Sequence, residues 1–384
     1  MKKCALVLSL AVTALGIGVR PAAAQLGGIT GALKKAQTVK QIADLKVTDA
    51  EERQIGQQVS DKMVETFGVY QDANVTKYVT LVGAVMALQS PRPGLDWQFV
   101  VLDTEGVNAF AAPGGFIHIT KGLLGLMKNE AELAGVLAHE IIHVTEKHTV
   151  NAIQQGDAIS LTSDSVGAAG GMTQSLIADF AQRAYSNILN GKFSRDDENE
   201  ADEKGVQLAN KVGYAPTGLT SALTKLIDRN KDAKEPNGLF ATHPAMKERL
   251  TKIDTTIRSK KLGATATVEA RYAKNITFDA KPASALATVA EGSRGLAGGG
   301  SEKKADEKPA AEADKKKEEK PSGGGMFSKL RPGGGSQAQQ SQTVASAGAR
   351  GVNPDRDAVG GPNKKRVPVK IGPSDIAEFQ KGIA

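Results

Sequence analysis

The chain has 384 residues, enough for one or two domains, and 40% of them are hydrophobic. Its formal net charge of +7 is too small for its length to indicate a nucleic-acid partner. Cys4 is the only cysteine, which excludes a disulfide framework and a cysteine-ligated metal in the body of the chain.

Residues 1–24 have the order of a secretory signal peptide. Lys2 and Lys3 precede an apolar run, Cys4–Val19, and small residues end at Ala24. The alternative is an uncleaved anchor, but the run is shorter than the roughly 20 residues of a membrane span. Cleavage would lower the net charge from +7 to +4. We therefore expect a periplasmic protein, free or peripheral at a membrane, with no integral segment after cleavage.

Two amphipathic helices follow a short N-terminal extension. Leu33–Phe67 reads mostly as helix, and Thr48 with Glu51 forms a capping box inside it. Asp72–Leu88 repeats the helical spacing of apolar residues. Both helices are interpreted as scaffold.

A small antiparallel sheet is predicted next. Its strands are Trp97–Leu102, Val107–Ala111 and Phe116–Thr120, with a turn at residues 113–115. His118 alternates with isoleucines and is interpreted as a strand-face or surface histidine.

The most informative stretch begins at Asn129, where NEAELAGVLAHEIIHVTEKH starts with a capping pattern and continues with an apolar stripe. Within this predicted helix His139 and His143 stand four residues apart, so both imidazoles lie on one face and can bind one metal ion. Glu140 is adjacent to them. Catalytic zinc takes three protein ligands and keeps one position for water, so a third ligand is required.

Further along, Met172–Leu189 is predicted to be a helix that either covers a cleft or packs in the ordinary way. Ser194 caps another helix, on which Glu198 and Asp202 lie one turn apart. One carboxylate could bind metal while the other orients a histidine ligand, although a solvated acidic face has the same pattern.

Two more helices, Tyr214–Arg229 and Pro244–Lys260, complete the helical part. His243 stands at the start of the second, either as a capping residue or as a neutral-pH group that assists chemistry. His148, five residues beyond His143, is expected to point off the ligand face.

Four ordered blocks resemble the HtpX/BepA-like gluzincin peptidases, relatives of the CAAX prenyl proteases. They are Asn108-Ala-Phe-Ala-Ala-Pro-Gly-Gly, His139-Glu-Ile-Ile-His143, Phe193-Ser-Arg with Glu198-Asn-Glu-Ala-Asp202, and Thr242-His243-Pro244. The resemblance implies a compact gluzincin fold, α+β and mainly helical with a small sheet.

The same resemblance implies site roles. Glu198 would be the third zinc ligand, Asp202 the partner of a ligand histidine, and Glu200 a solvated residue. His243 would approach the zinc, either closing the resting site or stabilising the tetrahedral intermediate. HtpX-type members carry membrane helices and BepA carries a helical-repeat tail, and this chain shows neither. The resemblance therefore implies less about partners and substrates than about the catalytic site.

The predicted function is a zinc-dependent endopeptidase of the cell envelope with one Zn²⁺ per chain. Glu140 acts as proton carrier, and the strand residues Asn108, Ala109, Phe110 and Ala111 hold an extended polypeptide substrate. Misfolded or unassembled envelope or outer-membrane proteins are the expected substrates. The alternative is an envelope chaperone or assembly factor with a latent zinc site, against which the intact Glu140 argues.

The predicted organisation is a signal peptide (1–24), an N-terminal extension (25–47), a zinc metallopeptidase domain (48–262), a short β-rich extension (263–290), a disordered low-complexity linker (291–361) and a short C-terminal docking segment (362–384). The last of these is expected to contain a strand at Val367–Ile371 and a helix from Ser374, which dock on the catalytic domain or on a partner.

Overall fold

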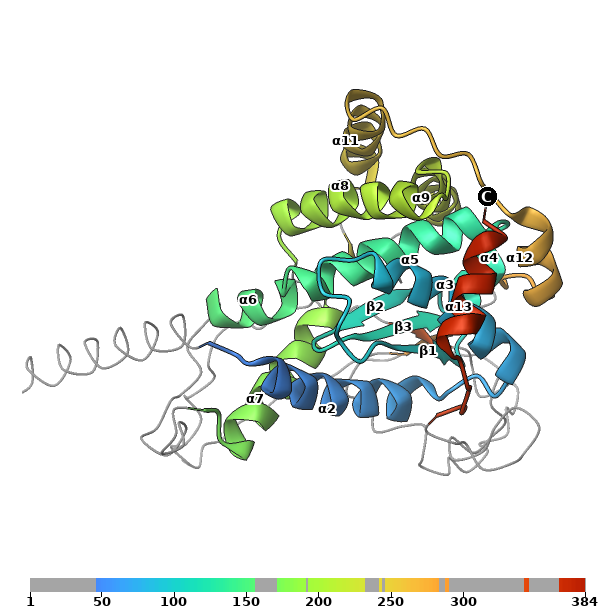
Figure 1. The fold of residues 1–384 in the computed structure, drawn as a ribbon. Helices are drawn as coiled ribbons and strands as arrows, with labels where there is room; N and C mark the ends of the chain where they lie inside the picture. The colour runs from blue at the N-terminus through green and yellow to red at the C-terminus, as the bar shows by residue number, and fades with distance from the viewer. Residues whose placement is uncertain are drawn as a thin grey trace, which may run out of the picture.

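A computed structural model describes residues 46–155, 171–190, 193–231, 242–243, 246–282, 287–289, 342–344 and 366–383. Within them helices dominate and surround a small three-stranded sheet (Figure 1), which confirms the predicted α+β, mainly helical fold class. The predicted signal peptide, the extension up to residue 45 and nearly all of the linker 291–361 lie outside the described residues. No described helix is long and apolar enough to cross a bilayer.

Each predicted helix has a counterpart among the described residues, whereas α4, α6 and α12 were not predicted. Their bounds are α2 (Asp49–Phe67), α3 (Ala73–Leu88), α4 (Lys121–Leu126), α5 (Glu130–Thr145), α6 (His148–Gln155), α7 (Gln174–Leu189), α8 (Arg195–Val212), α9 (Thr217–Asn230), α11 (Met246–Ser259), α12 (Glu269–Asn275) and α13 (Pro373–Lys381).

Side-chain caps explain where the main helices begin. Thr48 accepts a hydrogen bond from the Glu51 backbone N–H, and the Glu51 carboxylate accepts one from the Thr48 N–H. Ser194 caps α8 in the same reciprocal way, and Asn129 accepts from the third residue of α5. These bonds satisfy donors that a helix N-terminus leaves without intrahelical partners.

The sheet is mixed. Its strands β1 (Gln98–Leu102), β2 (Ala109–Ala112) and β3 (Phe116–Thr120) have the order β1-β3-β2. β2 pairs antiparallel with β3, as expected, but β1 pairs parallel with β3, so the antiparallel meander is wrong for β1. The strand order places β3 in the centre, between β1 and β2. Every residue of β2 and β3 is buried, whereas β1 has partly exposed positions.

His118 lies in this central strand and is fully buried, so the surface reading of it is wrong. Its Nε2 lies 2.9 Å from Ser60 Oγ on α2. Burial lowers the pKa of His118 to about 4, so the ring is neutral at ordinary pH.

Helix α5 occupies the middle of the molecule. All of its residues are buried, and it packs against α3, α8 and α9. In Figure 1, α2 and α7 lie on the opposite side of the sheet from α5 and α8. One apolar core therefore forms around α3, α5, α8 and α9, and a second between α2, α7 and the sheet.

The predicted β-rich extension is wrong over residues 264–278. This stretch forms helix α12 and a single bridge between Ala266 and Tyr214. Tyr272 anchors the helix, because its ring is buried and its hydroxyl donates to the Leu124 carbonyl. Burial of one aromatic side chain thus overrides the strand-like alternation. Beyond α12, β4 (Ala287–Val289) pairs antiparallel with β5 (Gln342–Val344), which lies inside the stretch predicted to be disordered.

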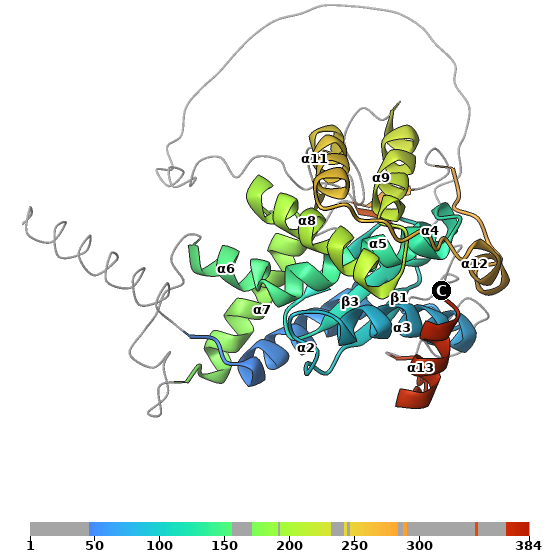
Figure 2. The same ribbon diagram turned by 45° about the horizontal axis from the view of Figure 1, so that its top comes forward.

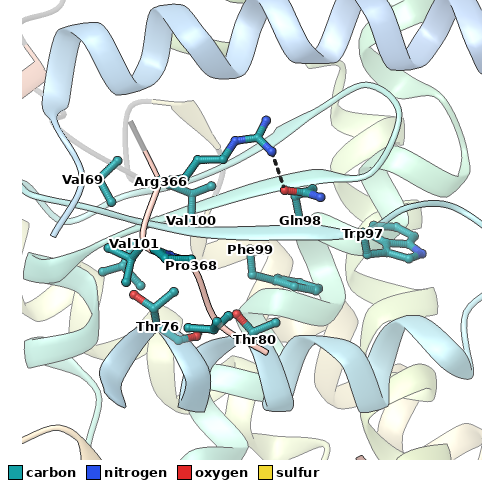
Figure 3. Close-up of a pocket in the computed structure, with 12 residues that line it drawn as sticks. Val69, Thr76, Thr80, Trp97, Gln98, Phe99, Val100, Val101, Arg366 and Pro368 are labelled. Atoms are coloured by element: carbon teal, nitrogen blue, oxygen red, sulfur yellow. Dashed lines mark hydrogen bonds between the residues drawn. The ribbon is translucent and has the colours of Figure 1, made fainter. Parts of the chain in front are cut away.

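The C-terminal segment, residues 366–383, lies against the body of the protein. Residues 366–372 form no strand, contrary to the prediction, whereas the predicted helix exists as α13. α13 packs on α3 (Figure 2), and Ile383 is buried in the main core. Residues 366–369 line a cavity of about 300 Å³ together with residues of β1 and α3 (Figure 3).

Helices α5 and α9 approach closely because Gly218 has no side chain. A Cβ atom added there would lie 2.1 Å from the Ala131 carbonyl oxygen, which is backbone and cannot move aside. We expect Gly218→Ala to destabilise the protein by about 1–3 kcal/mol, because overpacking separates the two helices. Thermal unfolding should show a melting temperature lower by several degrees.

Gly94→Ala is the matched control, because a Cβ atom at Gly94 would meet nothing within 4 Å. Equal melting temperatures for the two variants would contradict the close approach of α5 and α9.

Candidate metal centre

The centre is built where α8 crosses α5. His139 and His143 project from one face of α5, and their Nε2 atoms lie 3.1 Å apart. Gly205 permits the crossing, since a Cβ atom there would lie 3.2 Å from the His139 Cα atom. Glu198, in the first turn of α8, is thereby brought beside both rings. One of its carboxylate oxygens lies 3.5 Å from His143 Nε2 and the other 3.6 Å from His139 Nε2.

His243 completes the cluster from a distant part of the chain. Its Nδ1 lies 2.9 Å from Glu198 Oε1 and 3.3 Å from His139 Nε2. One nitrogen or oxygen atom from each of His139, His143, Glu198 and His243 falls within 4.8 Å of all the others, and all four side chains are buried. Four residues spread over more than 100 positions thus converge on one point.

Asp202 lies behind the cluster, one turn after Glu198. Its Oδ1 is 3.0 Å from His139 Nδ1, the ring nitrogen that faces away from Glu198. Arg249, on α11, donates to both Asp202 oxygens at 2.7 Å and lies 2.7 Å from Glu198. A carboxylate in this position fixes the orientation of a histidine ring.

The sequence reasoning missed Arg249. It shares the inward face of α11 with Met246 and Ile253, both buried. A charged residue at a core position of an amphipathic helix is the signal that could have found it, because buried charges are paired.

Glu140 is buried beside the cluster, and among the described residues neither of its carboxylate oxygens has a hydrogen-bond partner. Glu140 Oε1 lies 3.7 Å from the Nε2 atom of His243. Burial raises the pKa of Glu140, and nearby histidines oppose that rise without cancelling it.

The pKa of Glu198 shifts in the opposite direction from that of Glu140, and the pKa values of two neighbouring histidines shift as well. Burial raises the pKa of Glu198, but His243 and Arg249 lower it by more, so this carboxylate stays ionised. Burial lowers the pKa of His243, but Glu198 raises it by more. Burial and the neighbouring His139 hold the pKa of His143 well below its usual range, so its ring is neutral. A neutral imidazole and an ionised carboxylate are the forms that bind metal.

These residues fit a zinc ion. Two imidazole nitrogens and a carboxylate oxygen are a donor set found at catalytic zinc sites. The two Nε2 atoms face each other at 3.1 Å, and at most one of them could donate to the other. A cation at the point of convergence would be coordinated by the lone pairs of the two Nε2 atoms and by the ionised Glu198.

The predicted substrate strand also lies at the site. Ala109–Ala112 form β2, an outer strand of the sheet, and Asn108 immediately precedes it. Asn108 Oδ1 accepts a hydrogen bond from the Ala109 backbone N–H at 2.9 Å and from Thr242 Oγ1 at 3.2 Å. Asn108 thus connects β2 to the residue before His243.

Two side chains differ from their expected places. His148 does not point away from the cluster; its Nδ1 lies 2.9 Å from His143 Nδ1. Glu200 is partly exposed, and its carboxylate also makes a contact that was not predicted, with His148 Nε2 at 3.2 Å.

Comparisons with known proteins agree with this geometry. Residues 73–257 match the model of Peptidase family M48. The metalloprotease YcaL of Escherichia coli (strain K12) is 32% identical over 179 residues, which cover 46% of this chain and 68% of that protein. The metalloprotease LoiP of the same organism is 27% identical over 203 residues, covering 53% of this chain and 79% of LoiP.

The beta-barrel assembly-enhancing protease of Escherichia coli (strain K12) is 28% identical over 208 residues, or 52% of this chain. The matched region spans 42% of that relative, and 38% of the one from Yersinia pestis. This chain therefore shares about two fifths of the length of those proteins.

Proposed function

The chain belongs to peptidase family M48, and from that membership we propose that it is a zinc-dependent endopeptidase of the cell envelope that cleaves misfolded or unassembled proteins. The family resemblance expected from the four sequence blocks is thereby confirmed. The observation that carries the proposal is the convergence of four buried metal-ligand atoms within 4.8 Å, beside a carboxylate without a hydrogen-bond partner among the described residues.

In this proposal His139, His143 and Glu198 hold the zinc, one ion per chain. Bound zinc supplies a water of lowered pKa and polarises the carbonyl group of the peptide bond. Asp202 and Arg249 keep the His139 ring and the Glu198 carboxylate in place from behind. The protein's own contribution is therefore a rigid and buried set of ligands.

Glu140 carries the proton. Its carboxylate takes a proton from the attacking water and delivers it to the amine that leaves when the peptide bond breaks. Burial raises the pKa of Glu140, and a raised pKa suits a carboxylate that must both accept and release a proton.

His243 takes one of two roles in the proposal. Its contacts with Glu198 at 2.9 Å and with Glu140 at 3.7 Å support a resting state in which its ring closes the site. With substrate bound, the same ring would stabilise the oxyanion of the tetrahedral intermediate.

Extended polypeptide is the proposed substrate, held by strand addition to Asn108, Ala109, Phe110 and Ala111. The position of β2 at the edge of the sheet and beside α5 supports this role. The names of the beta-barrel assembly-enhancing proteases support envelope or outer-membrane proteins as substrates. The proposed periplasmic location rests on residues 1–24, which have the order of a secretory signal peptide.

Replacing Glu140 by Gln should keep zinc bound and abolish cleavage. The amide has nearly the same shape but cannot accept the proton, so we expect hydrolysis of an unfolded protein to slow by about 100-fold or more. Zinc content should stay at the wild-type level by elemental analysis.

Glu203→Gln is the control, because Glu203 is half exposed on α8 and pairs with Lys260. Full activity of Glu140→Gln would contradict the mechanism. The chaperone alternative predicts instead that Glu140→Gln complements a strain that lacks the gene.

Glu198→Ala should lose the metal, because the only carboxylate among the proposed ligands is removed. We expect about one zinc ion per chain in the wild type and a small fraction of that in the variant, since catalytic sites use three protein ligands. Elemental analysis after dialysis measures the content, with Glu203→Ala as control on the same helix. A Glu198→Ala protein with full zinc occupancy would show that another residue is the third ligand.

We also propose that the C-terminal segment docks on its own peptidase domain. Arg366 donates to Gln57 at 2.7 Å and to Gln98 at 3.1 Å. The Phe379 ring lies 3.9 Å from the Arg271 guanidinium carbon, and Ile383 is buried. These contacts support docking within one chain.

Phe379→Ala should therefore lower stability by about 1–2 kcal/mol, through lost apolar burial and the lost cation–π contact. Thermal unfolding measures this, with Glu378→Ala, an exposed neighbour on α13, as control. If deletion of residues 364–384 changed neither melting temperature, cleavage rate nor co-purifying proteins, the docking proposal would be wrong.

A further inference from the structure

We propose that His148 and Glu200 form a hydrogen-bonded chain that orients the ring of His143 for metal binding. The proposal rests on the proposed zinc site and adds two positioning residues to it. Neither residue touches the point where the four ligand atoms converge; both act through His143.

The backbone between α5 and α6 places the His148 ring beside Nδ1 of His143. Lys147, between α5 and α6, has a φ of 58°, which is left-handed and unusual for a residue with a side chain. A continuous helix would place a residue five positions on about 140° around the axis from His143. The left-handed residue breaks that geometry, and the centres of the two rings lie 4.9 Å apart at an angle of 79°.

The hydrogen bonds allow one arrangement of protons when His143 binds metal. Its Nε2 faces His139 and Glu198, so Nε2 must offer a lone pair and Nδ1 must carry the proton. That Nδ1–H points at His148 Nδ1, 2.9 Å away, which must accept. The remaining proton of His148 then lies on Nε2, 3.2 Å from a Glu200 oxygen that accepts it.

Lys204 and Glu146 anchor the far end of this chain. The Lys204 ammonium lies 2.7 Å from Glu200 and 2.8 Å from Glu146, near the end of α5. Glu200 is therefore held between α8 and the end of α5, although its side chain is 42% exposed. The hydrogen-bonded chain from His143 to Glu200 therefore joins α5, which carries both histidine ligands, to α8, which carries Glu198.

Residues of α8 thus support both histidine ligands of α5. His139 contacts Asp202 directly at 3.0 Å, whereas His143 contacts Glu200 through His148. Support of this kind fixes the ring orientation and the tautomer of a ligand, and its loss typically weakens metal binding about 10–100-fold.

Packing alone is the competing explanation for His148, because its side chain is buried. Phe193 already covers another part of the His143 ring, with centres 4.3 Å apart. If His148 only filled space, an aromatic ring without nitrogen would replace it. His148→Phe and His148→Asn separate these explanations, because the Asn Oδ1 atom keeps an acceptor close to the position of the ring Nδ1.

The experiment measures zinc affinity by competition with a chelator, using the full chain. It is accompanied by the visible spectrum of the Co²⁺-substituted protein, which reports ligand geometry, and by thermal unfolding of the metal-free protein. We expect His148→Phe to raise the zinc Kd about 10–100-fold and to alter the Co²⁺ spectrum. His148→Asn should stay within about threefold of the wild type, because the acceptor is retained.

Glu200→Ala provides a second test at a partly exposed position, with Glu203→Ala on the same helix as its control. We expect Glu200→Ala to weaken zinc binding about tenfold and Glu203→Ala to leave it unchanged. If His148→Phe fails to fold, the comparison of Glu200→Ala with Glu203→Ala still tests the proposal.

Equal zinc affinity in wild type and His148→Phe would overturn the proposal. So would equal weakening by His148→Phe and His148→Asn, or equal affinities of Glu200→Ala and Glu203→Ala. Those results leave the proposed zinc peptidase intact. A wild-type protein that binds no zinc would refute the proposed function and this inference together.

Discussion

The structure depends on the complete burial of α5, the helix that carries His139, Glu140 and His143. A buried helix must have its polar ends paired, because unpaired polar groups in a low-dielectric interior are costly. At the start of α5 the Glu130 carboxylate accepts from the Tyr214 hydroxyl at 2.6 Å and from Arg271 at 2.7 Å. At its end Arg92 donates to the Val144 carbonyl at 3.2 Å. Residues far apart in the sequence therefore fix the position of the helix face that carries His139 and His143.

The same constraint explains the residues around the site. Two ionised carboxylates, Glu198 and Asp202, lie in a buried region and require compensating charge. Arg249 provides a permanent positive charge to both, at 2.7 Å from each. The guanidinium is shared between a residue proposed to bind zinc and a residue proposed to orient His139. Stability and site geometry therefore depend on one ion-pair network.

Local patterns were enough to predict much of this arrangement. Side-chain caps at Thr48 and Ser194 and helical spacing predicted the main helices, which the structure confirms. The spacing of His139 and His143 on a predicted helix pointed to a metal site. The family resemblance, also confirmed, implied Glu198 as the third ligand. The parallel pairing of β1 could not be predicted, because it depends on the order of the strands in the sheet, and sequential strands usually pair with each other. Arg249 and the chain from His148 to Glu200 depend on contacts across helices and on one left-handed residue, which sequence spacing does not contain.

We expect one zinc ion to bind where α5 and α8 meet, and anomalous diffraction at the zinc edge from crystals of the full chain can locate it. One strong peak should lie at about 2.0–2.2 Å from His139 Nε2, His143 Nε2 and a Glu198 oxygen. A zinc-loaded crystal with no peak at this point, or with its peak bound by other residues, would show that this site does not hold the metal.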